Sequence, residues 1–170
     1  MGPIFSFIVT EVNSKLDILE HHLASEAGEH YRTVEEMIQY EVANGIITRS
    51  PEPGEQPSGS RTLLRLHRAL QFITLFCCEL AQADGTETFS AIAERAYSAT
   101  LATHHEWVLS SLVSASLNAL STLSSFFRRV SPEGSDEQVV DQLNTAVLAM
   151  QPVYDRIQTL YSDNGLLQLP

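Results

Sequence analysis

One long stretch free of helix breakers constrains the fold of this chain more than any other feature. It runs from Ser58 to Leu80, SGSRTLLRLHRALQFITLFCCEL, and it contains no proline or glycine after the opening Ser-Gly-Ser. Serine and glycine are typical of a helix start, and leucine and isoleucine recur through the rest of the stretch. The pattern predicts one long, mostly apolar helix that ends near Asp84-Gly85.

Three arginines interrupt the apolar pattern of this predicted helix. Arg61, Arg65 and Arg68 follow the spacing i, i+4, i+7, so their side chains project from one helix face. A solvated stripe on an amphipathic helix explains this spacing. An anion site explains it equally well, because the arginine fork is suited to holding phosphate. Spacing alone leaves both interpretations open.

The remainder of the chain also follows helical spacing, and no segment alternates with a period of two. Further helices are predicted over residues 4–21, 33–43, 87–102, 103–120, 123–130 and 136–161, the last with a kink at Pro152. A long loop, SPEPGEQPSGS, leads into the arginine helix, and residues 24–30 form a polar turn. We therefore expect an all-α fold of packed helical layers, formed by residues 1–170 as a single domain.

Two of these helices begin with a capping pattern. Thr33 is followed by Glu36, and Ser135 is followed by Gln138, which is the spacing of a capping box. Glu35 and Glu36 are accordingly interpreted as charges at a helix start, and not as catalytic carboxylates.

Composition narrows the classes of function. A net charge of −11 argues against general binding of nucleic acid, which needs a basic face. Lys15 is the single lysine beside nine arginines, so each cation is conspicuous. Cys77 and Cys78 are adjacent on a predicted helix, where a disulfide between them would be strained, and they are expected to be reduced thiols in the cytoplasm. No apolar run is long enough to span a bilayer.

No pattern in the chain predicts catalysis, a metal site or a cofactor. The histidine pairs at 21–22 and 104–105 are adjacent and not four residues apart, and HExxH, CxxC and GxSxG motifs are missing. From spacing alone, Glu11 and Lys15 form an ordinary surface ion pair. His105 alone would be a hydrogen-bonded structural residue.

Three sequence motifs, taken together and in this order along the chain, indicate a resemblance to a known family. FSFIxxEVxSKL near the start, SGSRTLLRLHRAL in the middle and HHEW later resemble the glycolipid transfer protein superfamily, and most of all its ceramide-1-phosphate transfer protein branch. The likeness covers residues 2–170. It implies a two-layer, all-helical sandwich that carries one sphingolipid between membranes without chemical change. It also implies a cytosolic protein in transient contact with membrane surfaces, and not an enzyme.

The resemblance assigns roles to five residues. Glu11 falls where the family usually has an aspartate that accepts hydrogen bonds from the sphingoid amide and hydroxyl. Lys15, Arg61 and Arg65 fall on phosphate-binding positions of the ceramide-1-phosphate branch, and His105 falls on the donor to the amide carbonyl. Neither the sugar-stacking tryptophan nor the asparagine of the glycolipid-binding branch is present at positions 65 and 15, so ceramide 1-phosphate is the expected ligand.

Physical chemistry agrees with these implied roles. A phosphate monoester carries between one and two negative charges at neutral pH, and three cations would meet it. Glu11 and His105 would together identify an amide, so a diacylglycerol phosphate should fit poorly. An unmatched buried polar group costs about 1–3 kcal/mol.

Three departures qualify the resemblance. Glu11 is one methylene longer than the usual aspartate, and Val108-Leu109-Ser110-Ser111 replaces residues that are often basic in the family. Compared with the family, the chain also begins inside the second helix, so we expect the first helix and part of the second to be absent and apolar surface to be exposed. An alternative is therefore a truncated lipid-binding or regulatory module that does not transfer lipid. A hydrolase, the third reading, lacks a nucleophile and base pair. The oligomeric state stays open.

Overall fold

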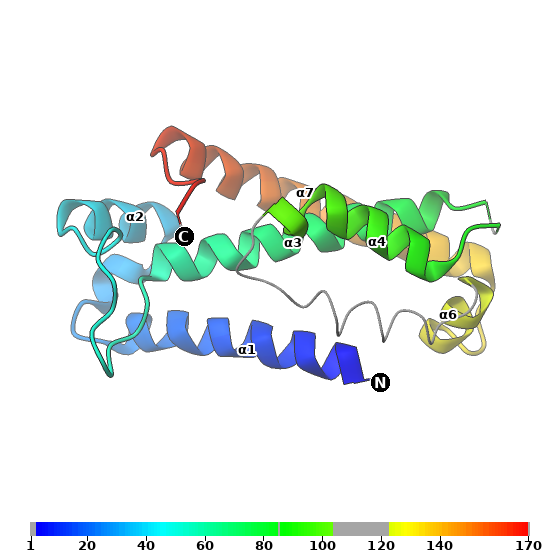
Figure 1. Cartoon of the computed structure of the whole chain (residues 1–170), viewed down its shortest axis with the longest axis horizontal. Helices are drawn as coiled ribbons and strands as arrows, with labels where there is room; N and C mark the ends of the chain where they lie inside the picture. Colours follow the sequence, from blue (N-terminus) through cyan, green and yellow to red (C-terminus); the bar gives the residue numbers. More distant parts are fainter. Residues whose placement is uncertain (1–2, 85, 104–122, 170) are drawn as a thin grey trace. The chain divides into compact units, whose positions relative to one another are not determined.

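All regular structure that the computed structural model describes is helical (Figure 1). The description covers residues 3–84, 86–103 and 123–169. The elements in chain order are α1 (Pro3–Ala24), η1 (Gly28–Tyr31), α2 (Val34–Ala43), α3 (Gly59–Gln82), α4 (Phe89–Ala99), η2 (Leu101–Thr103), α6 (Leu123–Val130) and α7 (Asp136–Asp163). The two 3-10 helices, η1 and η2, are single short turns.

Both predicted helix starts are confirmed, Thr33 as a side-chain cap and Ser135 with Gln138 as a full capping box. Thr33 has extended backbone and its Oγ1 accepts a hydrogen bond from the backbone N–H of Glu36 at 3.2 Å. Ser135 and Gln138 bond reciprocally, since the Ser135 N–H donates to Gln138 Oε1 at 3.1 Å and the Gln138 N–H donates to Ser135 Oγ at 3.3 Å. These contacts satisfy amides that have no partner within a helix, and they fix where α2 and α7 begin.

Other helix boundaries differ from the sequence pattern by a few residues. The predicted turn over 24–30 overlaps with η1, and α1 continues to Ala24. The helix expected over 87–102 is α4, which begins after a Thr88 cap that accepts from the Ala91 N–H at 3.2 Å. Pro152 lies inside α7, and the helix continues past it to Asp163. The predicted helix over 103–120 lies almost entirely outside the described residues.

The chain divides into two compact units, each with its own apolar core. The first unit comprises Phe5–His67 and Arg156–Pro170. Its core residues come from α2, the following loop, α3, α7 and the C-terminal tail: Ile38, Ile47, Leu64, Tyr161 and Leu166. The second unit is built from the described part of Arg68–Asp155. Its core residues come from α3, α4 and α6: Leu80, Phe89, Ile92 and Leu123.

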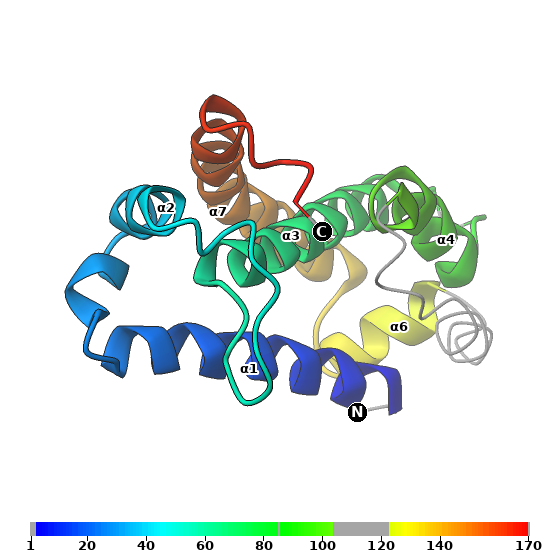
Figure 2. The ribbon, with the colours of Figure 1, turned by 60° about the vertical axis from the view of Figure 1, so that its left-hand side comes forward.

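In the first unit, the loop that follows α2 passes the C-terminal end of α1 before α3 begins (Figures 1 and 2). His22, near the end of α1, places its Nε2 at 2.7 Å from the Pro57 carbonyl oxygen. The His22 ring also stacks on Tyr31 with 4.7 Å between the ring centroids. The hydrogen bond joins the loop to α1 immediately before the arginine helix starts, and the ring contact joins η1 to α1.

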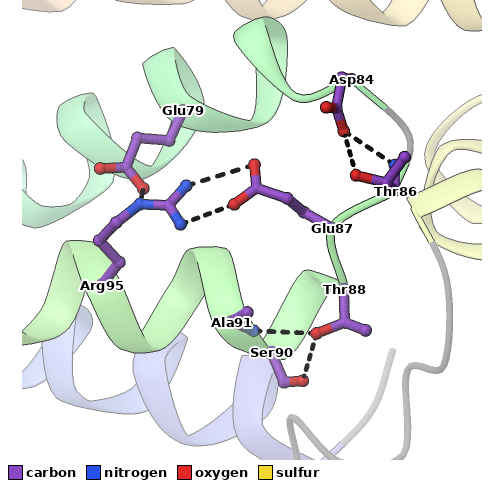
Figure 3. A network of polar contacts seen from close by, with 8 residues as sticks. All are labelled: Glu79, Asp84, Thr86, Glu87, Thr88, Ser90, Ala91 and Arg95. Carbon is purple, nitrogen blue, oxygen red and sulfur yellow. Dashed lines mark hydrogen bonds and ion pairs between the residues drawn. The ribbon is translucent and has the colours of Figure 1, made fainter.

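In the second unit, Arg95 of α4 joins two carboxylates (Figure 3). Its Nε donates to Glu79 of α3 at 2.9 Å, and its Nη1 donates to Glu87 at 2.7 Å. The arginine side chain is about half exposed, so each pair is a solvated surface contact that adds little to stability. The network joins α3 to α4 and to the segment that leads into α4.

Candidate functional site

The candidate site depends on how α3 begins, because Arg61 and Arg65 lie in its first two turns. Ser58 is the cap residue: its Oγ accepts from the Arg61 N–H at 3.0 Å, and its carbonyl oxygen accepts from the Thr62 N–H at 3.0 Å. The predicted helix start at Ser-Gly-Ser is therefore confirmed. The cap fixes the first turn, from which Arg61 extends, and Arg65 follows one turn later.

A buried glutamate that sequence reasoning missed holds the same turn. Glu41 of α2 is fully buried, and its two carboxylate oxygens accept from the backbone N–H groups of Gly59 at 2.6 Å and Ser60 at 3.0 Å. The Tyr31 hydroxyl donates to Glu41 at 3.1 Å. Burial first, and then the charge of Glu41, raises the pKa of Tyr31, so this hydroxyl stays protonated.

A tyrosine from α7 reaches the first turn of α3 as well. Tyr161 is fully buried and its hydroxyl donates to the Ser60 carbonyl oxygen at 2.7 Å. Burial, followed by the negative charge of Glu41, raises the pKa of Tyr161. Two turns further along α3, buried His67 places Nε2 at 2.7 Å from Gln158 Oε1 of α7. Buried polar groups from two other helices thus fix the start of α3.

The arginines of α3 do not form a solvated stripe. Arg61, Arg65 and Arg68 are all half-buried, and the Nε atoms of Arg61 and Arg65 are inaccessible to solvent. Arg61 Nε has no hydrogen-bond partner within residues 3–84, 86–103 and 123–169. Buried donors are nearly always paired, so an orphan guanidinium nitrogen favours the anion-site interpretation of the spacing.

The predicted pair on α1 is formed. Lys15 Nζ lies 3.4 Å from Glu11 Oε2, one helical turn away. The Lys15 side chain is only 15% exposed and that of Glu11 is 34% exposed. Lysine is rarely buried to this extent. The contact is therefore less solvated than the ordinary surface pair that spacing alone indicates.

Four of the five predicted site residues belong to the first compact unit, namely Glu11, Lys15, Arg61 and Arg65. Glu11 and Lys15 contact each other on α1, and Arg61 and Arg65 lie one turn apart on α3. His105 lies outside the described residues. No cluster of metal-binding side chains occurs in the ranges that the structure covers. None of the helices described there is both long and apolar enough to cross a bilayer.

The part of the chain that the structure describes is all-helical, with half-buried cations on α1 and α3, and comparison with known proteins specifies the family. The family model described as "Glycolipid transfer protein (GLTP)" matches residues 1–132. The chain belongs to this family of lipid transfer proteins. The expected all-α fold of the glycolipid transfer protein type is confirmed by solved structures of the same fold.

Several similar proteins are named as transfer proteins for ceramide 1-phosphate. A ceramide-1-phosphate transfer protein from Rattus norvegicus is 38% identical over 172 residues, which cover the whole chain and 79% of that protein. The mouse ceramide-1-phosphate transfer protein without ligand has a TM-score of 0.84 at 37% identity, covering 100% of this chain and 82% of that one. The human protein in complex with 12:0 ceramide 1-phosphate has a TM-score of 0.87 at 37% identity, covering 99% and 81%. The similarity to this branch that the three motifs indicate is confirmed.

Proposed function

We propose that the protein binds ceramide 1-phosphate and carries it between membranes without changing it chemically. One observation supports the proposal most: Arg61 is half-buried with an orphan Nε atom, one turn before Arg65, in a chain whose relatives are ceramide-1-phosphate transfer proteins. A buried cation without a partner is costly unless a ligand supplies the anion. The phosphate monoester of this lipid is such an anion.

In this proposal the phosphate is held by three cations from two helices. Arg61 and Arg65 offer guanidinium forks from α3, and Lys15 offers an ammonium group from α1. Guanidinium–phosphate bonds are charge-assisted and among the stronger hydrogen bonds. Lys15 is already held 3.4 Å from Glu11, which limits the entropy lost when the phosphate binds.

The amide of the lipid gives the second part of the recognition. Glu11 accepts from the amide N–H, and His105 donates to the amide carbonyl. A diacylglycerol phosphate offers no amide donor, so beside it Glu11 would keep only its contact with Lys15. Apolar helix faces take up the two hydrocarbon chains, which need a dry environment. We place the protein in the cytoplasm, in transient contact with membrane surfaces, in agreement with the free thiols of Cys77 and Cys78.

A vesicle assay tests the proposal. Donor vesicles carry fluorescent ceramide 1-phosphate, acceptor vesicles carry none, and the rate of transfer is measured for the wild type, Arg61→Leu and Arg65→Leu. Loss of one charge-assisted contact of about 1.5–3 kcal/mol weakens binding by about 10- to 100-fold. Arg32→Leu is the matched control, because it removes the same charge from an exposed position of the same compact unit.

Three results separate the alternatives. Transfer by the wild type, lost in both α3 variants and kept in Arg32→Leu, supports the proposal. Lipid retention in native mass spectrometry without any transfer would instead indicate a binding module. Equal affinity for ceramide 1-phosphate, ceramide and phosphatidic acid would refute the assignment of the phosphate and amide contacts.

A further inference from the structure

The amides at the start of α3 are already occupied by groups of the protein. The N–H groups of Gly59 and Ser60 donate to Glu41, and the N–H of Arg61 donates to Ser58 Oγ. The first amides of a helix have no partner inside the helix, and together with the helix dipole they form a ready site for a phosphate or carboxylate. Here the carboxylate that fills this site is internal.

Close packing shows that Glu41 is built into this position. The carboxylate is fully buried and spans both amides, and Tyr31 satisfies it from a third side. A Cβ atom on Gly59 would lie 2.7 Å from Met37 Sδ and 3.4 Å from Glu41 Oε1. The absence of a side chain at position 59 therefore allows α2 to bring its carboxylate against the helix start.

We propose that Glu41 is a positioning residue for phosphate recognition. It occupies the anion site of the α3 N-terminus and thereby leaves the guanidinium groups of Arg61 and Arg65 as the partners of the phosphate. This inference rests on the proposed function, because it needs the two arginines to bind the headgroup. Glu41 itself does not touch the lipid.

The placement of Glu41 has two physical effects. It fixes the first turn of α3, and binding groups need to be held to within about 0.5 Å to act together. It also removes a competing site: without the carboxylate, the free amides of Gly59 and Ser60 would attract the phosphate toward the helix end and away from Arg65. Both effects act on how the phosphate is held, so loss of Glu41 should change headgroup selectivity in addition to stability.

Glu41→Gln tests this inference, and it changes the shape of the side chain little. The NH₂ group that replaces one carboxylate oxygen cannot accept a hydrogen bond from a backbone N–H. Dissociation constants for ceramide 1-phosphate and for ceramide are measured in parallel. We expect the preference for the phosphorylated lipid to fall about tenfold, the equivalent of one good charge-assisted contact. Glu36→Gln, the same substitution at an exposed position of α2, should leave the preference within about twofold. An equal weakening for both lipids would mean that Glu41 is only structural and would overturn the inference.

A second measurement uses the wild-type chain and does not depend on how a variant folds. Nitrogen-15 NMR spectra are recorded as ceramide 1-phosphate in detergent is added. The Nε–Hε signals of Arg61 and Arg65 should shift, whereas the backbone amide signals of Gly59 and Ser60 should stay within the change seen for Glu36. Shifts at Gly59 and Ser60 as large as those of the arginines would overturn the inference.

The two proposals fail in different ways. If wild-type protein does not bind ceramide 1-phosphate, the proposed function and the role of Glu41 fall together. If the wild type binds and Arg65→Leu does not, but Glu41→Gln keeps full headgroup preference, only the role of Glu41 falls.

Discussion

Tyr161→Phe removes one buried hydrogen bond and leaves the apolar packing in place. The Tyr161 ring is fully buried in the core of the first unit, and its hydroxyl donates to the Ser60 carbonyl oxygen at 2.7 Å. Phenylalanine keeps the ring and removes only the donor. The buried Ser60 carbonyl oxygen then loses the hydrogen bond from this hydroxyl. We therefore expect the free energy of unfolding to fall by about 1–2 kcal/mol. For a chain of this length the loss lowers Tm by roughly 2–8 °C.

The same variant should change the pH dependence of stability. The pKa of Tyr161 is raised above its ordinary value of 10.0 in the folded chain, chiefly by burial. The neutral hydroxyl therefore contributes its full stability below pH 10, and that contribution is lost as the pH rises and the unfolded chain ionises. The slope from one such group is at most about 1.4 kcal/mol per pH unit. Tyr161→Phe should therefore lose less stability than the wild type as the pH rises above 10. Tyr31, whose pKa is also raised, still contributes its own part of the loss in both proteins.

Urea unfolding followed by circular dichroism at pH 7 and pH 11 measures both effects. The control is Tyr40→Phe, because the Tyr40 hydroxyl makes no hydrogen bond inside the ranges that the structure covers, while its ring stacks on His30 at 4.4 Å. The midpoint for Tyr161→Phe should fall with an unchanged m-value, and that of the control should not move. Identical midpoints for Tyr161→Phe and wild type would refute the view that this hydroxyl anchors the start of α3.

Two further predictions concern packing and thiol chemistry. Leu64→Ala in the core of the first unit should lower the free energy of unfolding, measured in urea, by about 2–5 kcal/mol. The control Leu148→Ala, at a position that is 75% exposed, should change it by no more than about 0.5 kcal/mol. Equal losses in the two variants would contradict the core assignment. Burial, followed by the neighbouring Cys78, raises the pKa of the Cys77 thiol above its ordinary value of 9.0. In a Cys78→Ser variant, Cys77 should therefore react with iodoacetamide at pH 8 more slowly in the folded protein than after unfolding in urea. The same reaction rate before and after unfolding would show that the thiol is not shielded.

Local patterns in the sequence predicted the helix starts well, because a cap depends on residues only three positions apart. Thr33 with Glu36, and Ser135 with Gln138, form the contacts that their spacing indicates. Helix ends were predicted less closely, since α4 stops at Ala99 where the pattern continues to residue 102. Apolar periodicity carries no information on where tertiary contacts let a helix fray.

The candidate site was predictable only where a family motif covers it. The motifs lead to Glu11, Lys15, Arg61 and Arg65, and the structure adds that the lysine and the two arginines are half-buried, which spacing cannot reveal. Glu41 could not be predicted. It is one acidic residue near the end of a short helix, and its partners at Gly59 and Ser60 are eighteen and nineteen positions away. Contacts of this kind depend on how α2 packs against the start of α3.

A structure of the protein with bound ceramide 1-phosphate tests the central claim most directly. The measured quantities are the distances from the phosphate oxygens to the guanidinium nitrogens of Arg61 and Arg65 and to Lys15 Nζ. The proposal predicts all three groups at charge-assisted hydrogen-bond distance, about 2.7–2.9 Å, with Gly59 and Ser60 still bonded to Glu41. A phosphate seated away from both arginines, or on the amides at the start of α3, would contradict it.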